Sequence, residues 1–161
     1  MAEASRLRSG GIAAALRARS PEAKCKNGKL TKVMKRKYEV IVKTDPVDAP
    51  KEHEMSAAVI LAYHFKTDII FLRPETKKTP DIDVNGTKWE IKSPKGSGKK
   101  TIDNNLRTAR KQSRHIVLDL RRAKLHQSKA EARIRHYLIA GPHKIKRLKI
   151  ITKNSKIIDI L

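Results

Sequence analysis

Two carboxylates and one amine lie within twelve residues of each other, on either side of a turn sequence. Asp81 precedes the pair Asn85-Gly86, and Glu90 and Lys92 follow it. Asn-Gly is typical of the two-residue type I′ turn, because both residues tolerate a positive φ, so the segment predicts a β-hairpin. Glu90 and Lys92 are two positions apart on one strand and share a face. We call Asp81, Glu90 and Lys92 the acid–lysine cluster.

This cluster contains the groups that hydrolysis of a phosphodiester requires. Mg²⁺ prefers oxygen ligands and retains several waters, so two carboxylates and the carbonyl of Ile91 are enough to hold it. A bound cation activates water and neutralises the phosphate, while Lys92 can orient the water or stabilise the developing charge. Three alternatives stay open: Asp81 as a turn residue, Asp83 as the ligand in its place, and Glu90 in an exposed cross-strand ion pair.

The chain of 161 residues carries a formal net charge of +22. Such an excess opposes a compact fold by self-repulsion and is typical of proteins that bind a polyanion, so the sequence predicts contact with nucleic acid. The expected binding groups are basic residues of the loop 95–100 and of the segment after it, namely Lys95, Lys99, Lys100, Arg107, Arg110, Lys111 and Arg114. Aromatic residues form only 4% of the chain, which disfavours base stacking and favours a structured backbone, either duplex DNA or folded RNA.

Periodicity and turn residues divide the chain into an arm and one domain. Residues 1–37 hold eleven Lys or Arg against two acids, which predicts a basic arm that is mobile or weakly helical. Residues 38–161 predict an α/β (α+β) domain with helices around a sheet, in the core order α-β-β-β-α-β. The expected helices are 51–65, 101–114 and 128–139, and the expected strands are 38–44, 68–73, the hairpin 80–93, 115–120, 148–152 and 156–160.

Other features narrow the class of protein. Cys25 is the single cysteine, which excludes an internal disulfide and a zinc site built on paired cysteines. No run approaches the roughly 18 apolar residues of a membrane span. The first 20 residues are too interrupted for a convincing signal peptide, and they suit an organellar transit peptide or a nucleic-acid-binding arm equally well.

The hairpin and the elements after it resemble a known family of nucleases. Pro80-Asp81 followed by Trp89-Glu90-Ile91-Lys92-Ser93-Pro94 matches the PD…ExK signature of the PD-(D/E)xK nuclease superfamily. Together with Gln112 and the strand 116–120, this segment is most similar to the tRNA-nuclease-like C-terminal domain of contact-dependent growth-inhibition (CdiA) toxins. The resemblance covers about residues 50–160, and it implies the restriction-endonuclease-like mixed sheet of that superfamily.

The resemblance also implies roles for further residues. It assigns the metal to Asp81 and Glu90, and it suggests that Glu54 on the first core helix completes the metal shell, with Glu52 as an alternative. Glu54 could equally serve only the helix dipole. The family often carries a glutamine where Gln112 stands, directed toward the site, although an exposed helix residue would look the same.

The implied function is that of a metal-dependent endonuclease, a phosphodiester hydrolase that cleaves tRNA rather than DNA. Mg²⁺ is the expected cofactor, with Mn²⁺ or Zn²⁺ as alternatives. The resemblance further implies a toxin module that acts in the cytoplasm and is neutralised by an acidic immunity protein. A DNA nuclease of the same fold from a mobile element and a nucleic-acid-binding protein without catalysis are the competing hypotheses.

Overall fold

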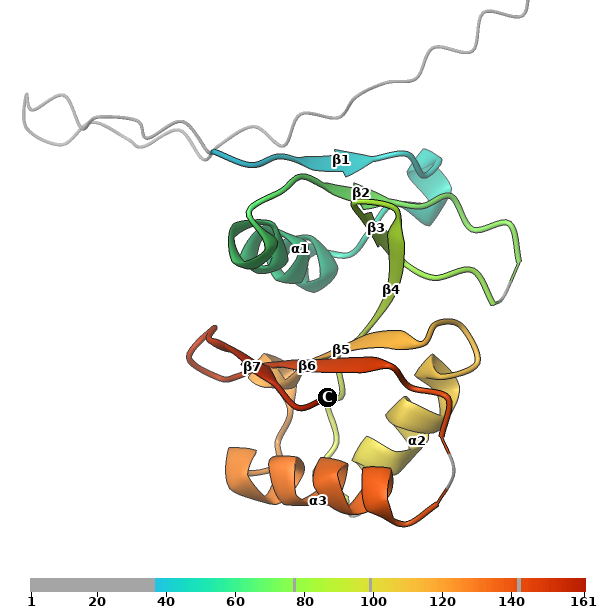
Figure 1. The fold of residues 1–161 in the computed structure, drawn as a ribbon. Helices are drawn as coiled ribbons and strands as arrows, with labels where there is room; N and C mark the ends of the chain where they lie inside the picture. Colours follow the sequence, from blue (N-terminus) through green and yellow to red (C-terminus); the bar gives the residue numbers. More distant parts are fainter. Residues whose placement is uncertain (1–36, 77, 99, 142) are drawn as a thin grey trace, which may run out of the picture.

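The computed structural model describes residues 37–161 except 77, 99 and 142, so nearly all of the expected basic arm lies outside the described residues. The described residues form a seven-stranded sheet with three α-helices (Figure 1). The helices are α1 (Glu52–Phe65), α2 (Thr101–Ala109) and α3 (Gln127–Ile139). The strands are β1 (Val40–Val42), β2 (Ile69–Phe71), β3 (Ile82–Val84), β4 (Thr87–Lys92), β5 (His115–Asp119), β6 (Arg147–Ile151) and β7 (Ile157–Asp159), and short 3₁₀ turns span Pro46–Asp48 and Leu120–Arg122.

The sheet is mixed, and its strands lie side by side in the order of the sequence. The pairs β1–β2, β4–β5 and β5–β6 are parallel, whereas β2–β3, β3–β4 and β6–β7 are antiparallel. Figure 1 shows α1 on one face of the sheet and α2 and α3 on the other. The expected α+β class and the element order α-β-β-β-α-β, here α1 to β5, are therefore confirmed.

Each face of the sheet is covered by its own apolar core. On the α1 face, small residues of the helix such as Ala57 and Ala58 pack closely against buried Trp89 and Ile91 of β4. On the other face, α2 and α3 cover the alternate residues of β5 and β6, including Ile116 and Leu148. Each fully buried Leu or Ile contributes about 1.5–3 kcal/mol by leaving water. Because strand residues alternate between faces, Glu90 and Lys92 point toward the α2 side.

The hairpin has the turn that its sequence predicts. Asn85 and Gly86 adopt φ values of 49° and 78°, as a type I′ turn requires. The turn fixes the register in which Ile82 pairs with Trp89, and continuing this register places Asp81 opposite Glu90. Asp83 takes part in the turn, where its Oδ1 accepts a hydrogen bond from the Gly86 N–H at 2.7 Å.

The second helix is shorter than the sequence predicts. It ends at Ala109, so the expectation of a helix to residue 114 is wrong, and residues 111–114 form a turn and a bend. Residues 110–114 contain no apolar side chain that could continue the buried stripe of α2. The basic residues of this segment therefore do not share one helix: Arg107 lies in α2, Arg110 is its C-cap, and Lys111 and Arg114 follow the helix.

A buried ion pair joins the end of β5 to the start of α1. Asp119 is fully buried and accepts hydrogen bonds from the Arg121 side chain at 2.9 Å to Nε and 2.7 Å to Nη2. Arg121 in turn donates to the Ser56 hydroxyl at 2.7 Å and to the His53 carbonyl at 3.4 Å. The first turn of α1 is thereby attached to the centre of the sheet, and Asp119 has a structural role.

Loss of this ion pair is expected to destabilise the fold. Asp119→Ala leaves Arg121 without its carboxylate in a poorly solvated position, and we expect it to lower the free energy of unfolding by about 3 kcal/mol. Asp45→Ala is the control, because Asp45 pairs with Arg73 between side chains that are 54% and 69% exposed, and its loss should cost less than about 1 kcal/mol. Urea denaturation measures both, and equal effects would contradict the assigned role.

Candidate active site

The structure brings the three members of the acid–lysine cluster together. Asp81 Oδ2 accepts a hydrogen bond from the Ile91 N–H at 2.8 Å, so the residue preceding β3 is held against β4. Lys92 Nζ donates to Glu90 Oε1. The Glu90 side chain is fully buried, whereas the Lys92 side chain is 23% exposed and so remains accessible to a ligand.

Both carboxyl groups of the cluster have a raised pKa. Burial, and after it the negative charge of Asp81, raise the pKa of Glu90 to about 7 against the opposing effect of Lys92. Burial also raises the pKa of Asp81, although the Ile91 N–H and the Lys92 ammonium lower it. A buried and a half-buried carboxylate that disfavour each other's charge form a site where added positive charge is favourable. Such perturbed acids are typical of functional sites.

Glu54 reaches the same region from α1. Its charge contributes to the raised pKa of Asp81, and both residues line a cavity of about 110 Å³. One of its carboxylate oxygens accepts a hydrogen bond from the Lys51 N–H at 2.8 Å, which caps the helix. Glu54 therefore lies near Asp81 and also serves the helix end, so the two sequence interpretations are compatible.

Gln112 lies just beyond α2 and contacts the segment that leads to Asp81. Its Nε2 donates to the Thr79 carbonyl at 3.4 Å, two residues before Asp81. The neighbouring Ser113 hydroxyl donates to the Lys88 carbonyl at 2.7 Å. These two contacts attach the segment after α2 to both sides of the hairpin, so the position of Gln112 suits support of the site.

Two residues that sequence reasoning missed line the cavity beside Asp81. Thr44 and Asp48 come from the connection between β1 and α1. The Thr44 Oγ1 is buried and, among the described residues, has no hydrogen-bond partner. Asp48 stands between two prolines directly before α1, and this is the one signal that could have indicated it.

The predicted nucleic-acid-binding residues are exposed at the surface. Exposure is observed for Lys95, Lys100, Arg107, Arg110, Lys111 and Arg114, while Lys99 lies outside the described residues. Arg110 to Arg114 flank Gln112, so part of the basic surface adjoins the cluster. None of the helices within the described residues has the length and hydrophobicity that a membrane crossing requires.

The donor atoms of the cluster suit a hard divalent cation. Glu90 Oε2 is buried and has no hydrogen-bond partner among the described atoms, and Asp81 adds a second carboxylate. Within residues 37–161, apart from the three omitted positions, no three His, Cys, Asp or Glu side chains form a ready metal-binding group. A cation that keeps several of its waters needs only two carboxylates, as Mg²⁺ often does.

The fold and the cluster define an α+β protein whose mixed sheet holds paired acids and a lysine on the strand β4. The family model of the contact-dependent growth inhibition CdiA C-terminal domain matches residues 77–157, just over half of the chain, including Asp81, Glu90 and Lys92. The chain belongs to this family.

A solved structure has the same fold. One chain of the CdiA-CT/CdiI toxin and immunity complex from Burkholderia pseudomallei is similar with a TM-score of 0.55 and 22% sequence identity, over 74% of this chain and 97% of that chain. At this identity the similarity concerns the fold. No curated protein has a significantly similar sequence.

Glu90 should make the stability of the metal-free protein depend on pH. The unfolded chain releases this proton near pH 4.5, whereas the folded chain keeps it up to about pH 7, so the folded state binds more protons between these values and stability falls as the pH rises. Glu90→Gln imitates the protonated acid. In EDTA we expect it to match the wild type near pH 5 and to be more stable at pH 8 by on the order of 2 kcal/mol.

Urea denaturation from pH 5 to pH 8 measures this difference. The exposed carboxylate of Glu75 provides the control, and Glu75→Gln should leave the pH dependence of the wild type unchanged. Parallel curves for the wild type and Glu90→Gln would contradict the raised pKa of Glu90.

Proposed function

We propose that this chain is a metal-dependent endonuclease of the PD-(D/E)xK type, and that it hydrolyses phosphodiester bonds in tRNA. The observation that supports the proposal is the fully buried Glu90 beside the half-buried Asp81 and next to Lys92, in a chain of net charge +22. A structural protein gains nothing from placing a second acid beside a buried one, because each opposes the charge of the other.

Each residue of the cluster has a separate proposed role in the reaction. Asp81 and Glu90 would hold Mg²⁺, with Glu54 close enough to contribute through a water molecule. The bound cation would lower the pKa of a water molecule and neutralise the phosphate. Lys92 keeps a positive charge at the accessible side of the pair, where it can orient the attacking water and stabilise the developing negative charge. Gln112 would fix the segment that carries Asp81.

The proposed substrate is a structured RNA rather than a flexible single strand. Trp89 and Phe71 are buried in the core and are not available to stack on bases, whereas the basic side chains around Gln112 are exposed. Such a surface suits recognition of a folded backbone. Within structured RNA we propose tRNA as the specific substrate, because the segment around Asp81 and Glu90 resembles the tRNA-nuclease-like domain of CdiA toxins. Hydrolysis of duplex DNA is the alternative that an assay must exclude.

The family also supports a biological role. The similar solved structure is named as a toxin and immunity complex, and we extend that role to this chain as a toxin module delivered to a target cell. It would act on tRNA in the cytoplasm. An acidic immunity protein would complement the strongly basic surface and block access to the cluster.

Cleavage should depend on the cluster, and on Asp81 rather than on the nearby Asp83. We expect Asp81→Asn, Glu90→Gln and Lys92→Ala each to reduce the rate of tRNA cleavage in Mg²⁺ at least about a hundredfold, as loss of one electrostatic group commonly does. Asp83→Asn is the matched control, since its side chain can still accept the turn hydrogen bond, and it should retain activity. Gel assays with tRNA and plasmid DNA, in Mg²⁺ or EDTA, measure the rates.

The control for lysine is Lys88→Ala, which removes an exposed amine from the same strand. Wild-type protein that binds tRNA without cleaving it in Mg²⁺, Mn²⁺ or Zn²⁺ would refute the nuclease. Loss of activity in Asp83→Asn but not in Asp81→Asn would move the site along the hairpin.

Binding of the cation should be measurable without any substrate. Mg²⁺ at a concentration a hundred times its Kd should stabilise the wild type by about 2.7 kcal/mol. Asp81→Asn and Glu90→Gln should lose this thermal shift, whereas Asp83→Asn should keep it. Equal shifts in all four proteins would show that the cation binds elsewhere, and Mn²⁺ and Zn²⁺ in the same assay rank the metals.

A further inference from the structure

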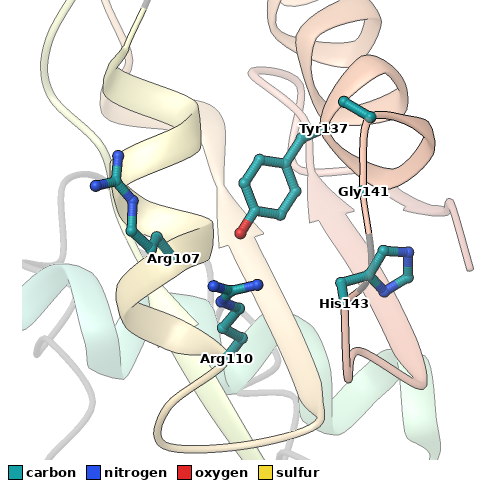
Figure 2. A pocket seen from close by; sticks show the side chains of 6 residues that line it. Arg107, Arg110, Tyr137, Gly141 and His143 are labelled. Atoms are coloured by element: carbon teal, nitrogen blue, oxygen red, sulfur yellow. The ribbon is translucent and has the colours of Figure 1, made fainter.

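A second cavity lies away from the acid–lysine cluster, where α2 and the end of α3 meet. Its volume is about 230 Å³, and it is lined by Arg107 and Arg110 from the end of α2 and by Tyr137, Ala140, Gly141 and His143 from α3 and the connection to β6. Figure 2 shows these side chains from close by. The carboxylates of the candidate active site take no part in it.

No described acidic residue pairs with either of the two guanidinium groups of this cavity. In the described part of the chain, neither Arg107 nor Arg110 forms a salt bridge, and the side-chain contact of Arg107 is with the neutral Asn104 at 2.7 Å. By contrast, Arg133 on α3 is paired with Asp103 of α2. The ion pair between Asp103 and Arg133 therefore holds α2 and α3 together. The two arginines of the cavity take no part in it and remain available to a ligand.

The hydroxyl of Tyr137 adds a neutral hydrogen-bond donor to the two guanidinium groups of the cavity. Tyr137 projects from α3 and directs its phenolic oxygen toward α2, the helix that carries both arginines (Figure 2). Guanidinium groups and a hydroxyl are the donors that oxygen-rich anions accept, and arginine binds phosphate with two parallel hydrogen bonds. The concave shape surrounds such an anion on more than one side, which a flat basic surface does not do.

We propose that this cavity binds a backbone phosphate of the nucleic-acid substrate, at a distance from the phosphate that is cleaved. The inference rests on the proposed nuclease function, since that function supplies the polyanion. In Figure 1 the segment before β3, the end of α2 and the connection after α3 all lie at the right-hand side of the molecule. Arg110 is two residues from Gln112, whose side chain contacts Thr79 beside Asp81. The end of α2 therefore joins the cavity to the segment that contacts Thr79, next to the candidate active site.

A purely structural role makes a different prediction. Basic residues near the C-terminal end of a helix stabilise its dipole, and Arg107 and Arg110 lie at that end of α2. In that case their replacement lowers the stability of the fold and leaves the affinity for nucleic acid unchanged. The dipole also needs neither a cavity nor a tyrosine hydroxyl.

Binding of fluorescent tRNA in EDTA, where cleavage does not occur, tests the inference. We expect Arg110→Gln to weaken binding roughly tenfold and to lower the slope of log Kd against log salt by about 1. Tyr137→Phe leaves the charge unchanged and should still weaken binding roughly threefold. Arg135→Gln is the matched control, because it removes the same charge from an exposed site on α3 outside the cavity, and it should have little effect.

Several outcomes would overturn the inference. Equal losses in Arg110→Gln and Arg135→Gln would show diffuse electrostatics rather than a site. Wild-type affinity in Arg110→Gln and Tyr137→Phe, together with a lower Tm, would show the structural role. Because binding is measured without cleavage, a wild type that cuts no nucleic acid would refute the proposed function and leave this test valid.

Inorganic phosphate distinguishes a substrate site from a site for a free anion. In NMR titrations, phosphate should shift the ring resonances of Tyr137 and the guanidinium resonances of Arg107 and Arg110, and Arg110→Gln should abolish the Tyr137 shift. If Arg110→Gln loses that shift but retains full affinity for tRNA, the cavity serves a small anion and the proposal is wrong.

Discussion

The burial of Glu90 beside Asp81 is the constraint on which the site depends. A carboxylate with no contact with solvent must be neutralised, and here the Lys92 ammonium does so on one side while the other oxygen has no partner among the described residues. The Ile91 N–H holds Asp81 at the opposing position. The arrangement leaves net negative charge inside a strongly basic molecule. This charge favours positive charge at one point of a molecule whose surface is otherwise basic.

The strand β4 carries this constraint because of its place in the sheet. It pairs in antiparallel fashion with β3 and in parallel fashion with β5. The hairpin and the strands that are connected through helices therefore meet at β4. Trp89 and Ile91 anchor one face of the strand in the α1 core, which leaves Glu90 and Lys92 on the other face. The alternation of side chains along one strand thus separates the residues that anchor the candidate site from the acid and the lysine that form it.

The local parts of this arrangement were predictable from the sequence, and the non-local parts were not. Asn85-Gly86 determines the turn and the turn determines the register, so the meeting of Asp81, Glu90 and Lys92 follows from a dozen residues. The sequence did not indicate the residue at which α2 ends, because the helical spacing of the charged residues Arg110 and Arg114 says nothing about burial. Thr44 and Asp48 could not be assigned to the site, because only the tertiary packing places the connection before α1 close to Asp81.

The order in which parts of the site form has a kinetic consequence. The β3–β4 hairpin closes a loop of a few residues, whereas β1–β2, β4–β5 and β5–β6 each join strands across a helix, and such distant contacts form slowly. The paired acids can meet early, while Glu54 and Gln112 reach them only after these crossovers are complete. A chain that passes through a narrow opening in unfolded form would therefore rebuild the candidate site in two stages, and the second stage would set the delay before the site is complete.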